Sequence, residues 1–215
     1  MKIGVLGTGM VGQAIGSKLI QLGHEVKMGS RTADNEKARR WVKANGPRAS
    51  QGTFADAAAF GEVLFHCTAG ATSLDALRMA GADHLRGKIL IDIANPLDFS
   101  GGMPPTLAIC NTDSLGEQIQ RAFPETRVVK ALNTVNSSVM VNPSLVPGDH
   151  DAFICGNDPE AKAFVTTVLK DWFGWRSVID LGDITAARAT EMLLPMWLRL
   201  WGVLQTPVFG LKVVW

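Results

Sequence analysis

The first thirty-two residues constrain the fold most, because they place a glycine-rich turn between an apolar strand and a helix. Residues 2–6 (KIGVL) have the pattern of a short buried strand, and residues 13–22 carry apolar side chains at helical spacing. Between them, Gly7, Gly9 and Gly12 form a G-x-G-x-x-G motif. Gly7 would allow the tight turn, Gly9 a close approach of pyrophosphate to the backbone, and Gly12 close packing of helix on strand. The motif predicts a dinucleotide-binding βαβ unit; the alternative is a glycine-rich turn in an unrelated α/β fold.

The end of the second expected strand indicates which dinucleotide is bound. NAD-binding units usually carry Asp or Glu there, whereas residues 29–32 of this chain are GSRT. Arg31 can pair with a 2′-phosphate that a carboxylate would repel, and Ser30 and Thr32 can donate hydroxyl bonds to it. These residues predict NADP(H), with Lys37 as the next cation most able to reach the phosphate; the alternative is Arg31 as a solvated charge. Lys37 lies on the next expected helix, and two further cations on that helix, Arg39 and Arg40, are expected to be solvated.

Strand and helix patterns alternate along the rest of the chain, which is typical of a Rossmann-type, doubly wound, mostly parallel sheet. Prolines and glycine near residue 147 suggest a joint. We therefore expect a dinucleotide-binding domain over residues 1–147 and a small C-terminal α/β extension over residues 148–215, for substrate binding and dimerisation. Expected strands cover residues 48–50, 63–67, 88–93, 127–131, 152–155 and 177–181; expected helices cover 34–45, 54–60, 73–82, 115–123, 159–172 and 184–204.

Small or polar residues follow several of these strands. Thr68, Asn95 and Asn133 each come directly after an apolar strand pattern. Ligands of open α/β sheets lie outside the carboxyl ends of the strands, so these side chains are candidate ligand contacts. His66, inside a strand, is expected to be a hydrogen-bonded core histidine.

Composition excludes several classes of function. The 21 Lys and Arg residues nearly balance 20 Asp and Glu, so neither a nucleic-acid nor a membrane partner is expected. The chain has no Tyr, which excludes short-chain dehydrogenases that use a tyrosine acid. Three widely spaced cysteines are expected to be buried thiols and not a metal site. Met1 leads directly into the first strand with no export signal before it, so a cytoplasmic location is expected.

Residues 192–201 (MLLPMWLRLW) are apolar on nearly every side of the expected C-terminal helix. Such a helix is normally buried all round, but Glu191, Pro195 and Arg199 make it too broken to span a bilayer. A homodimer interface through this helix, closing an acceptor pocket, would complete its burial. A plain core helix is the alternative.

With these motifs in view, the chain resembles the F420-dependent NADP oxidoreductases, which pass hydride between NADP(H) and the deazaflavin coenzyme F420. It is also similar to the NADPH domain of transmembrane ferric reductases. The resemblance covers essentially the whole length, and its motifs are Gly7-Thr8-Gly9, Gly29-Ser30-Arg31, residues 129–134 (VKALNT) and residues 155–158 (CGND).

The resemblance implies roles for further residues. Thr8, Met10 and Val11 would contact the pyrophosphate, and Thr68 and Ala69 the ribose side. Asn95, Pro96, Ala131 and Asn133 would lie near the nicotinamide. The archaeal members have Pro and an aromatic residue where this chain has residues 68–70 (TAG), and His in place of Asn133. Both departures border the hydride acceptor, which could be F420, FMN, FAD, iron reached through a flavin, or a small carbonyl.

Hydride transfer to a flavin-type ring needs no side-chain acid, which agrees with a sequence that shows no triad or metal cluster. Two other hypotheses remain. One is a β-hydroxyacid-type dehydrogenase with Lys130 as proton carrier and Asn133 orienting the substrate. The other is a non-enzymatic NADPH sensor.

Overall fold

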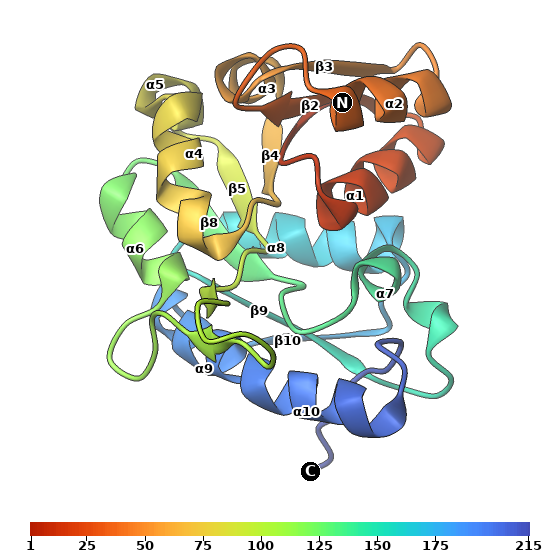
Figure 1. The fold of residues 1–215 in the computed structure, drawn as a ribbon, viewed down its shortest axis with the longest axis vertical. Coiled ribbons are helices and arrows are strands. Elements are labelled where there is room, and N and C mark those ends of the chain that lie inside the picture. The colour runs from red at the N-terminus through yellow and green to blue at the C-terminus, as the bar shows by residue number, and fades with distance from the viewer.

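The computed structural model describes residues 1–215 and contains one eight-stranded sheet with helices on both faces (Figure 1). The strand order is β10-β9-β8-β5-β4-β1-β2-β3, and all neighbouring strands are parallel except β8 and β9. The strands are β1 (Lys2–Leu6), β2 (Glu25–Ser30), β3 (Ala49–Thr53), β4 (Val63–His66), β5 (Ile89–Asp92), β8 (Arg127–Ala131), β9 (Asp151–Gly156) and β10 (Ser177–Asp180). The predicted Rossmann-type, mostly parallel fold is confirmed.

Two hydrophobic clusters cover the two faces of the sheet, because successive strand residues point to opposite sides. Ile3 and Val5 of β1 belong to the larger cluster, whereas Leu6 belongs to the smaller one. Helices α1 (Met10–Gln21), α2 (Glu36–Asn45), α7 (Ser137–Val141) and α8 (Pro159–Thr167) contribute to the larger cluster. Helices α3 (Phe54–Phe60), α4 (Ser73–Ala80), α5 (Ala82–Leu85), α6 (Leu115–Ala122) and α9 (Ala187–Met192) contribute to the smaller one.

The C-terminal part of the chain extends the sheet beyond β8. Strand β9 pairs with β8 in the antiparallel sense, and β10 follows at the edge. Helices α9 and α10 (Leu194–Leu204) then run along the end of the molecule opposite β2 and β3 (Figure 1). A small hairpin of β6 (Leu97–Asp98) and β7 (Thr106–Leu107) lies in the long connection after β5.

Several predicted helices are interrupted in the structure. The helix expected over residues 73–82 divides into α4 and α5 at Gly81, which has φ +90°. The helix expected over residues 159–172 ends in a π-helical turn over Val168–Trp172. The expected C-terminal helix divides into a 3-10 turn (Ile184–Ala186), α9 and α10. None of the helices is both long and apolar enough to cross a membrane.

Candidate functional site

A cavity of about 620 Å³ lies at the carboxyl ends of β1, β2 and β4. Its position agrees with the general rule for ligand sites of open α/β sheets. Eight of the predicted cofactor contacts line it: Gly7, Thr8, Gly9, Ser30, Arg31, Lys37, Thr68 and Ala69. Residues that the sequence did not single out complete the wall, including Asn35, Phe54, Thr72, Asp75 and Met79.

The three glycines of the turn have different surroundings. Gly7 has φ +126°, and Gly12 packs so closely that a Cβ there would lie 2.1 Å from the carbonyl oxygen of Gly7. Gly9 has ordinary extended backbone, φ −76° and ψ −174°, and a Cβ there would meet no protein atom within 4 Å. The protein itself therefore needs glycine at positions 7 and 12. The open space at Gly9 is a cradle that fits a pyrophosphate lying against the backbone.

The N-terminus of α1 completes this cradle. No side chain caps the helix, and its first turn carries no acidic residue. The first N–H groups of an α-helix have no partner within the helix, and the helix dipole favours negative charge at this end. The donor set therefore suits phosphate oxygens.

The cations beyond β2 fall into two groups. Arg31 and Lys37 line the cavity and make no ion pair within the chain. Arg39 pairs with Asp34 at 3.6 Å, and Arg40 pairs with Glu36, both away from the cavity wall. The two unpaired cations are therefore free to meet a 2′-phosphate.

The hydroxyl groups beside these cations are less available. Ser30 Oγ donates to the carbonyl oxygen of Thr32 at 2.6 Å, so its single proton is already used inside the turn. Thr32 is exposed and does not line the cavity. The other predicted contacts outside the cavity wall are Met10, Val11, Gly12, Asn95, Pro96, Ala131 and Asn133.

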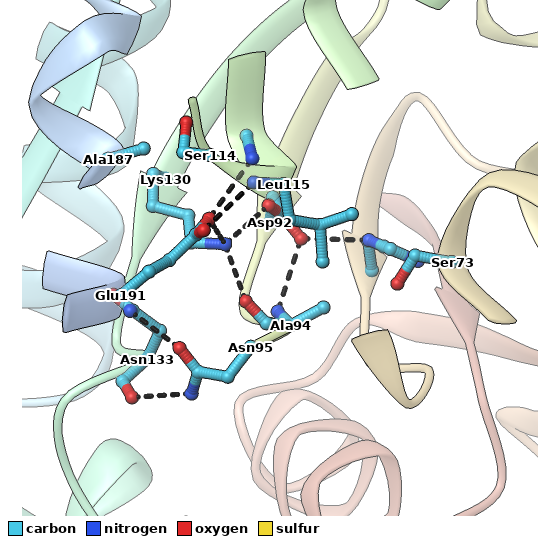
Figure 2. Close-up of polar contacts among 12 residues, drawn as sticks. Ser73, Asp92, Ala94, Asn95, Ser114, Leu115, Lys130, Asn133, Ala187 and Glu191 are labelled. Atoms are coloured by element: carbon cyan, nitrogen blue, oxygen red, sulfur yellow. Dashed lines mark hydrogen bonds and ion pairs between the residues drawn. The ribbon is translucent and has the colours of Figure 1, made fainter. Parts of the chain in front are cut away.

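Asn95 and Asn133 lie together at the carboxyl ends of β5 and β8 (Figure 2). Asn95 Nδ2 donates to the backbone oxygen of Asn133 at 2.8 Å, and Asn133 Nδ2 donates to Asn95 Oδ1 at 2.9 Å. Leu132, just before Asn133, has φ +62°. A positive φ is unusual for a large side chain and persists only where the surrounding structure imposes it. The two amides are thus held in a fixed arrangement.

A row of buried polar side chains crosses the sheet beside this pair. His66 of β4, Asp92 of β5 and Lys130 of β8 are direct neighbours in register and are fully buried. His66 Nδ1 lies 2.8 Å from Asp92 Oδ1, and Lys130 Nζ donates to Asp92 Oδ2 at 2.8 Å. Glu191 of α9 lies 2.8 Å from Lys130 Nζ through Oε1 (Figure 2). The prediction that His66 is a hydrogen-bonded core histidine is confirmed.

Glu191 also joins the row to helix α6. Its carboxylate accepts the N–H groups of Leu115 at 2.8 Å and of Gly116 at 3.0 Å. Burial by itself raises the pKa of Asp92, but the Lys130 ammonium and the His66 hydrogen bond outweigh it, so the pKa lies below its usual range. Burial by itself lowers the pKa of Lys130, but Asp92 and Glu191 outweigh it and raise that pKa. Asp92 is therefore ionised and Lys130 charged at neutral pH.

This arrangement contradicts the hypothesis that Lys130 carries protons to a substrate. Its ammonium group is fully buried and donates to Asp92, Glu191 and the backbone oxygen of Ala94. A proton carrier must reach the reacting group directly or through one water. Lys130 is instead a structural cation of the sheet.

Sequence reasoning missed Asp92 and Glu191. A signal was present, since each is a lone acidic residue in an apolar stretch, as in residues 89–93 (ILIDI) and 190–194 (TEMLL). Charged residues are almost never fully buried unless they are paired. Two such carboxylates and Lys130, itself within an apolar strand, could therefore have been expected to meet.

The C-terminal helix is only partly covered within the single chain. Trp197 is buried within the chain, where its ring stacks on Phe209 at 5.3 Å and lies 5.6 Å from Trp201. Trp201, Val203 and Leu204 are exposed, so the alternative of a plain core helix is wrong, and the interface that would complete the burial stays a prediction. Of the cysteines, Cys110 is exposed, which also corrects the expectation of three buried thiols.

The fold, the glycine cradle and the two free cations define a nucleotide-binding oxidoreductase of the Rossmann type that uses NADP(H). Residues 2–96 match the family model described as NADP oxidoreductase, coenzyme F420-dependent. The F420-dependent NADP reductase of Methanocaldococcus jannaschii is 30% identical over 209 residues, which cover 93% of this chain and 92% of that protein. The chain belongs to the family of F420-dependent NADP oxidoreductases.

Two further proteins are similar over at least nine-tenths of this chain. A crystal structure from Arthrobacter sp. FB24, assigned provisionally as an F420-dependent NADP reductase, is 54% identical with a TM-score of 0.95, and all of both chains is covered. The metalloreductase STEAP3 of Rattus norvegicus is 30% identical over 204 residues, which are 91% of this chain and 38% of that protein.

Proposed function

We propose that the chain transfers a hydride between NADP(H) and a deazaflavin acceptor of the coenzyme F420 type, or a closely related flavin. The observation that carries the proposal is that the polar side chains next to the cavity are already held in hydrogen bonds and ion pairs within the protein. Asn95 and Asn133 are bonded to each other, and Lys130 is held in its ion pairs. None of them can serve as the acid that reduction of a carbonyl needs, whereas hydride transfer to a flavin-type ring needs none.

The strand order supports one orientation of the nucleotide. Along the sheet, the cations after β2 come first, the glycine turn after β1 second, and Thr68 after β4 third. With the 2′-phosphate at Arg31 and the pyrophosphate at Gly9, the nicotinamide half would continue across β4 toward Asn95 and Asn133. The amide pair would then border the hydride-transfer position.

The residues contribute binding, orientation and exclusion of water in this proposal. Bound NADP(H) supplies or accepts the hydride at its nicotinamide C4. Arg31 and Lys37 would hold the 2′-phosphate, and the backbone of Thr8 to Val11 the pyrophosphate. Positioning two reactants in this way accounts for much of the rate enhancement of reactions that need no side-chain acid.

We also propose that the C-terminal segment over residues 148–215 forms a homodimer contact. Exposed apolar side chains gather on α10, where Trp201, Val203 and Leu204 are uncovered. A groove of about 490 Å³ lies between Met103 and Pro104 on one side and α10 on the other. Exposed apolar patches of this kind are typical of interfaces.

An anaerobic screen of NADPH oxidation tests the acceptor. Equal concentrations of F420, FMN, FAD and a small ketone are each offered with NADPH and, as the nucleotide control, with NADH. We expect the highest rate with NADPH and F420, lower rates with FMN or FAD, and none with the ketone. Turnover of the ketone alone would overturn the proposal, and tight NADPH binding without turnover of any acceptor would favour a sensor.

A further inference from the structure

A continuous chain of polar contacts joins the C-terminal helices to the cofactor cavity. Glu191 contacts Lys130, Lys130 contacts Asp92, and Asp92 contacts His66. His66 Nε2 then lies 2.7 Å from Thr68 Oγ1, and Thr68 lines the cavity. Figure 2 shows the part of this chain from Glu191 to Asp92. The network therefore ends on one hydroxyl group at the nucleotide site.

The direction of each hydrogen bond follows from the groups involved. Ionised Asp92 can only accept, so His66 must carry its proton on Nδ1. A neutral imidazole has one proton, which leaves Nε2 as an acceptor. Thr68 must then donate its hydroxyl proton to His66 Nε2. Toward the cavity, Thr68 Oγ1 therefore presents lone pairs and no proton.

Ser73 does not change this polarity. Its Oγ lies 3.2 Å from Thr68 Oγ1 and 3.2 Å from the backbone oxygen of Ala69, and a hydroxyl has one proton for either acceptor. If Ser73 donates to Thr68, one lone pair of Thr68 Oγ1 remains for a ligand. In both cases the Thr68 oxygen meets the ligand as an acceptor.

We propose that His66 is a positioning residue that fixes Thr68 Oγ1 as an acceptor for a hydrogen-bond donor of the nicotinamide half of NADP(H), a ribose hydroxyl or the carboxamide N–H. The proposal rests on the nucleotide orientation proposed above, in which this half crosses β4. A lone-pair oxygen repels phosphate oxygens and attracts O–H and N–H groups. Thr68 and Arg31 lie on opposite sides of the glycine turn. Thr68 would thus bind the nicotinamide half of the nucleotide, and Arg31 the half with the 2′-phosphate.

The ion pairs explain why this polarity is stable. Lys130 keeps Asp92 ionised, and Glu191 with the α6 N–H groups holds Lys130 in place. An Asp92 that was protonated could donate to His66 and reverse both downstream bonds. The buried charges therefore keep the proton of His66 on Nδ1, in addition to linking the strands of the sheet.

A double-mutant cycle of Thr68 and His66 tests the proposal. The Kd of each variant is measured for two ligands, NADPH and 2′,5′-ADP, which lacks the nicotinamide half. Thr68→Val should raise the Kd for NADPH about 2- to 12-fold, the range for one neutral hydrogen bond. Thr68→Ser, which keeps the hydroxyl, should bind like the wild type. His66→Asn can still donate to Asp92 but cannot reach Thr68, and it should weaken NADPH binding no more than Thr68→Val. The double variant should equal Thr68→Val alone, and 2′,5′-ADP should bind all variants equally.

Other outcomes separate the two proposals. Multiplying losses in the double variant, or equal losses for both ligands, would make His66 merely structural and overturn the inference. A wild type that binds neither ligand would overturn the proposed function. Nitrogen NMR of His66 in the wild type gives a test that no folding defect can affect. We expect the Nδ1–H tautomer, and an Nε2–H tautomer or an imidazolium would refute the polarity.

Discussion

Replacing Arg31 by Ala should remove most of the preference for NADPH over NADH. The Arg31 side chain is exposed, lines the cavity and makes no ion pair, so its loss should change the free energy of unfolding by less than about 0.5 kcal/mol. A charge-assisted hydrogen bond contributes about 1.5–3 kcal/mol. The Kd for NADPH should therefore rise about 10- to 150-fold, because each 1.4 kcal/mol is a factor of ten.

Calorimetric titration of both nucleotides measures this effect. NADH has no 2′-phosphate, so its Kd should change less than about twofold. Arg39→Ala is the matched control, since Arg39 lies eight residues further along the chain, on α2, but pairs with Asp34 at 3.6 Å and does not line the cavity. Lys37→Ala should weaken NADPH binding in the same direction, and added salt should reduce the loss in both variants.

Two results would refute the reasoning. An equal loss of affinity for NADPH and NADH would mean that Arg31 contacts a part common to both nucleotides. A loss in Arg39→Ala as large as that in Arg31→Ala would mean that general positive charge, and not a placed guanidinium, attracts the cofactor.

Gly9, Lys130 and Trp201 test the pyrophosphate cradle, the buried ion pairs and the proposed interface. Gly9→Val should fold, since a Cβ there meets nothing within 4 Å, but it should lose NADPH binding, whereas Gly12→Ala should lower the melting temperature. Wild-type affinity of Gly9→Val for NADPH would contradict the cradle. Lys130→Met removes the ammonium group that pairs with two buried carboxylates and should cost about 3–5 kcal/mol at pH 7 in urea unfolding. The pKa of Asp92 is lowered in the wild type and should be raised in this variant, so the deficit should shrink at pH 5; a constant deficit would contradict this. Trp201→Glu should convert the proposed dimer to a folded monomer in light scattering, and a wild-type monomer at micromolar concentration would contradict the interface.

The sequence alone determined the nucleotide-binding half of the protein. The strand, glycine turn and helix of residues 2–22 lie within one βαβ unit, so local spacing was enough to predict them. Arg31 follows directly after β2, and the carboxyl end of a strand is where a ligand lies. The family motifs gave the same nucleotide. Such features depend only on residues that are close together in sequence, so the sequence is enough to predict them.

Only the tertiary structure decided which charged groups are free. Lys37, Arg39 and Arg40 lie on the same helix, and their ion-pair partners and the cavity wall separate them. Lys130 was open to assignment as a proton carrier until the pairing of β5 with β8 placed it on Asp92, 38 residues away.

The C-terminal half shows the same limit of local patterns. Trp197 and Trp201 both lie in the apolar stretch of residues 192–201, but only Trp197 is buried, because Phe209 folds back onto it. Glu191 reaches Lys130 only because α9 returns beside α6 and the antiparallel β9 extends the sheet. The physical reason is that a buried charge is stable only beside its partner, and the chain path, not the local pattern, brings that partner within 3 Å.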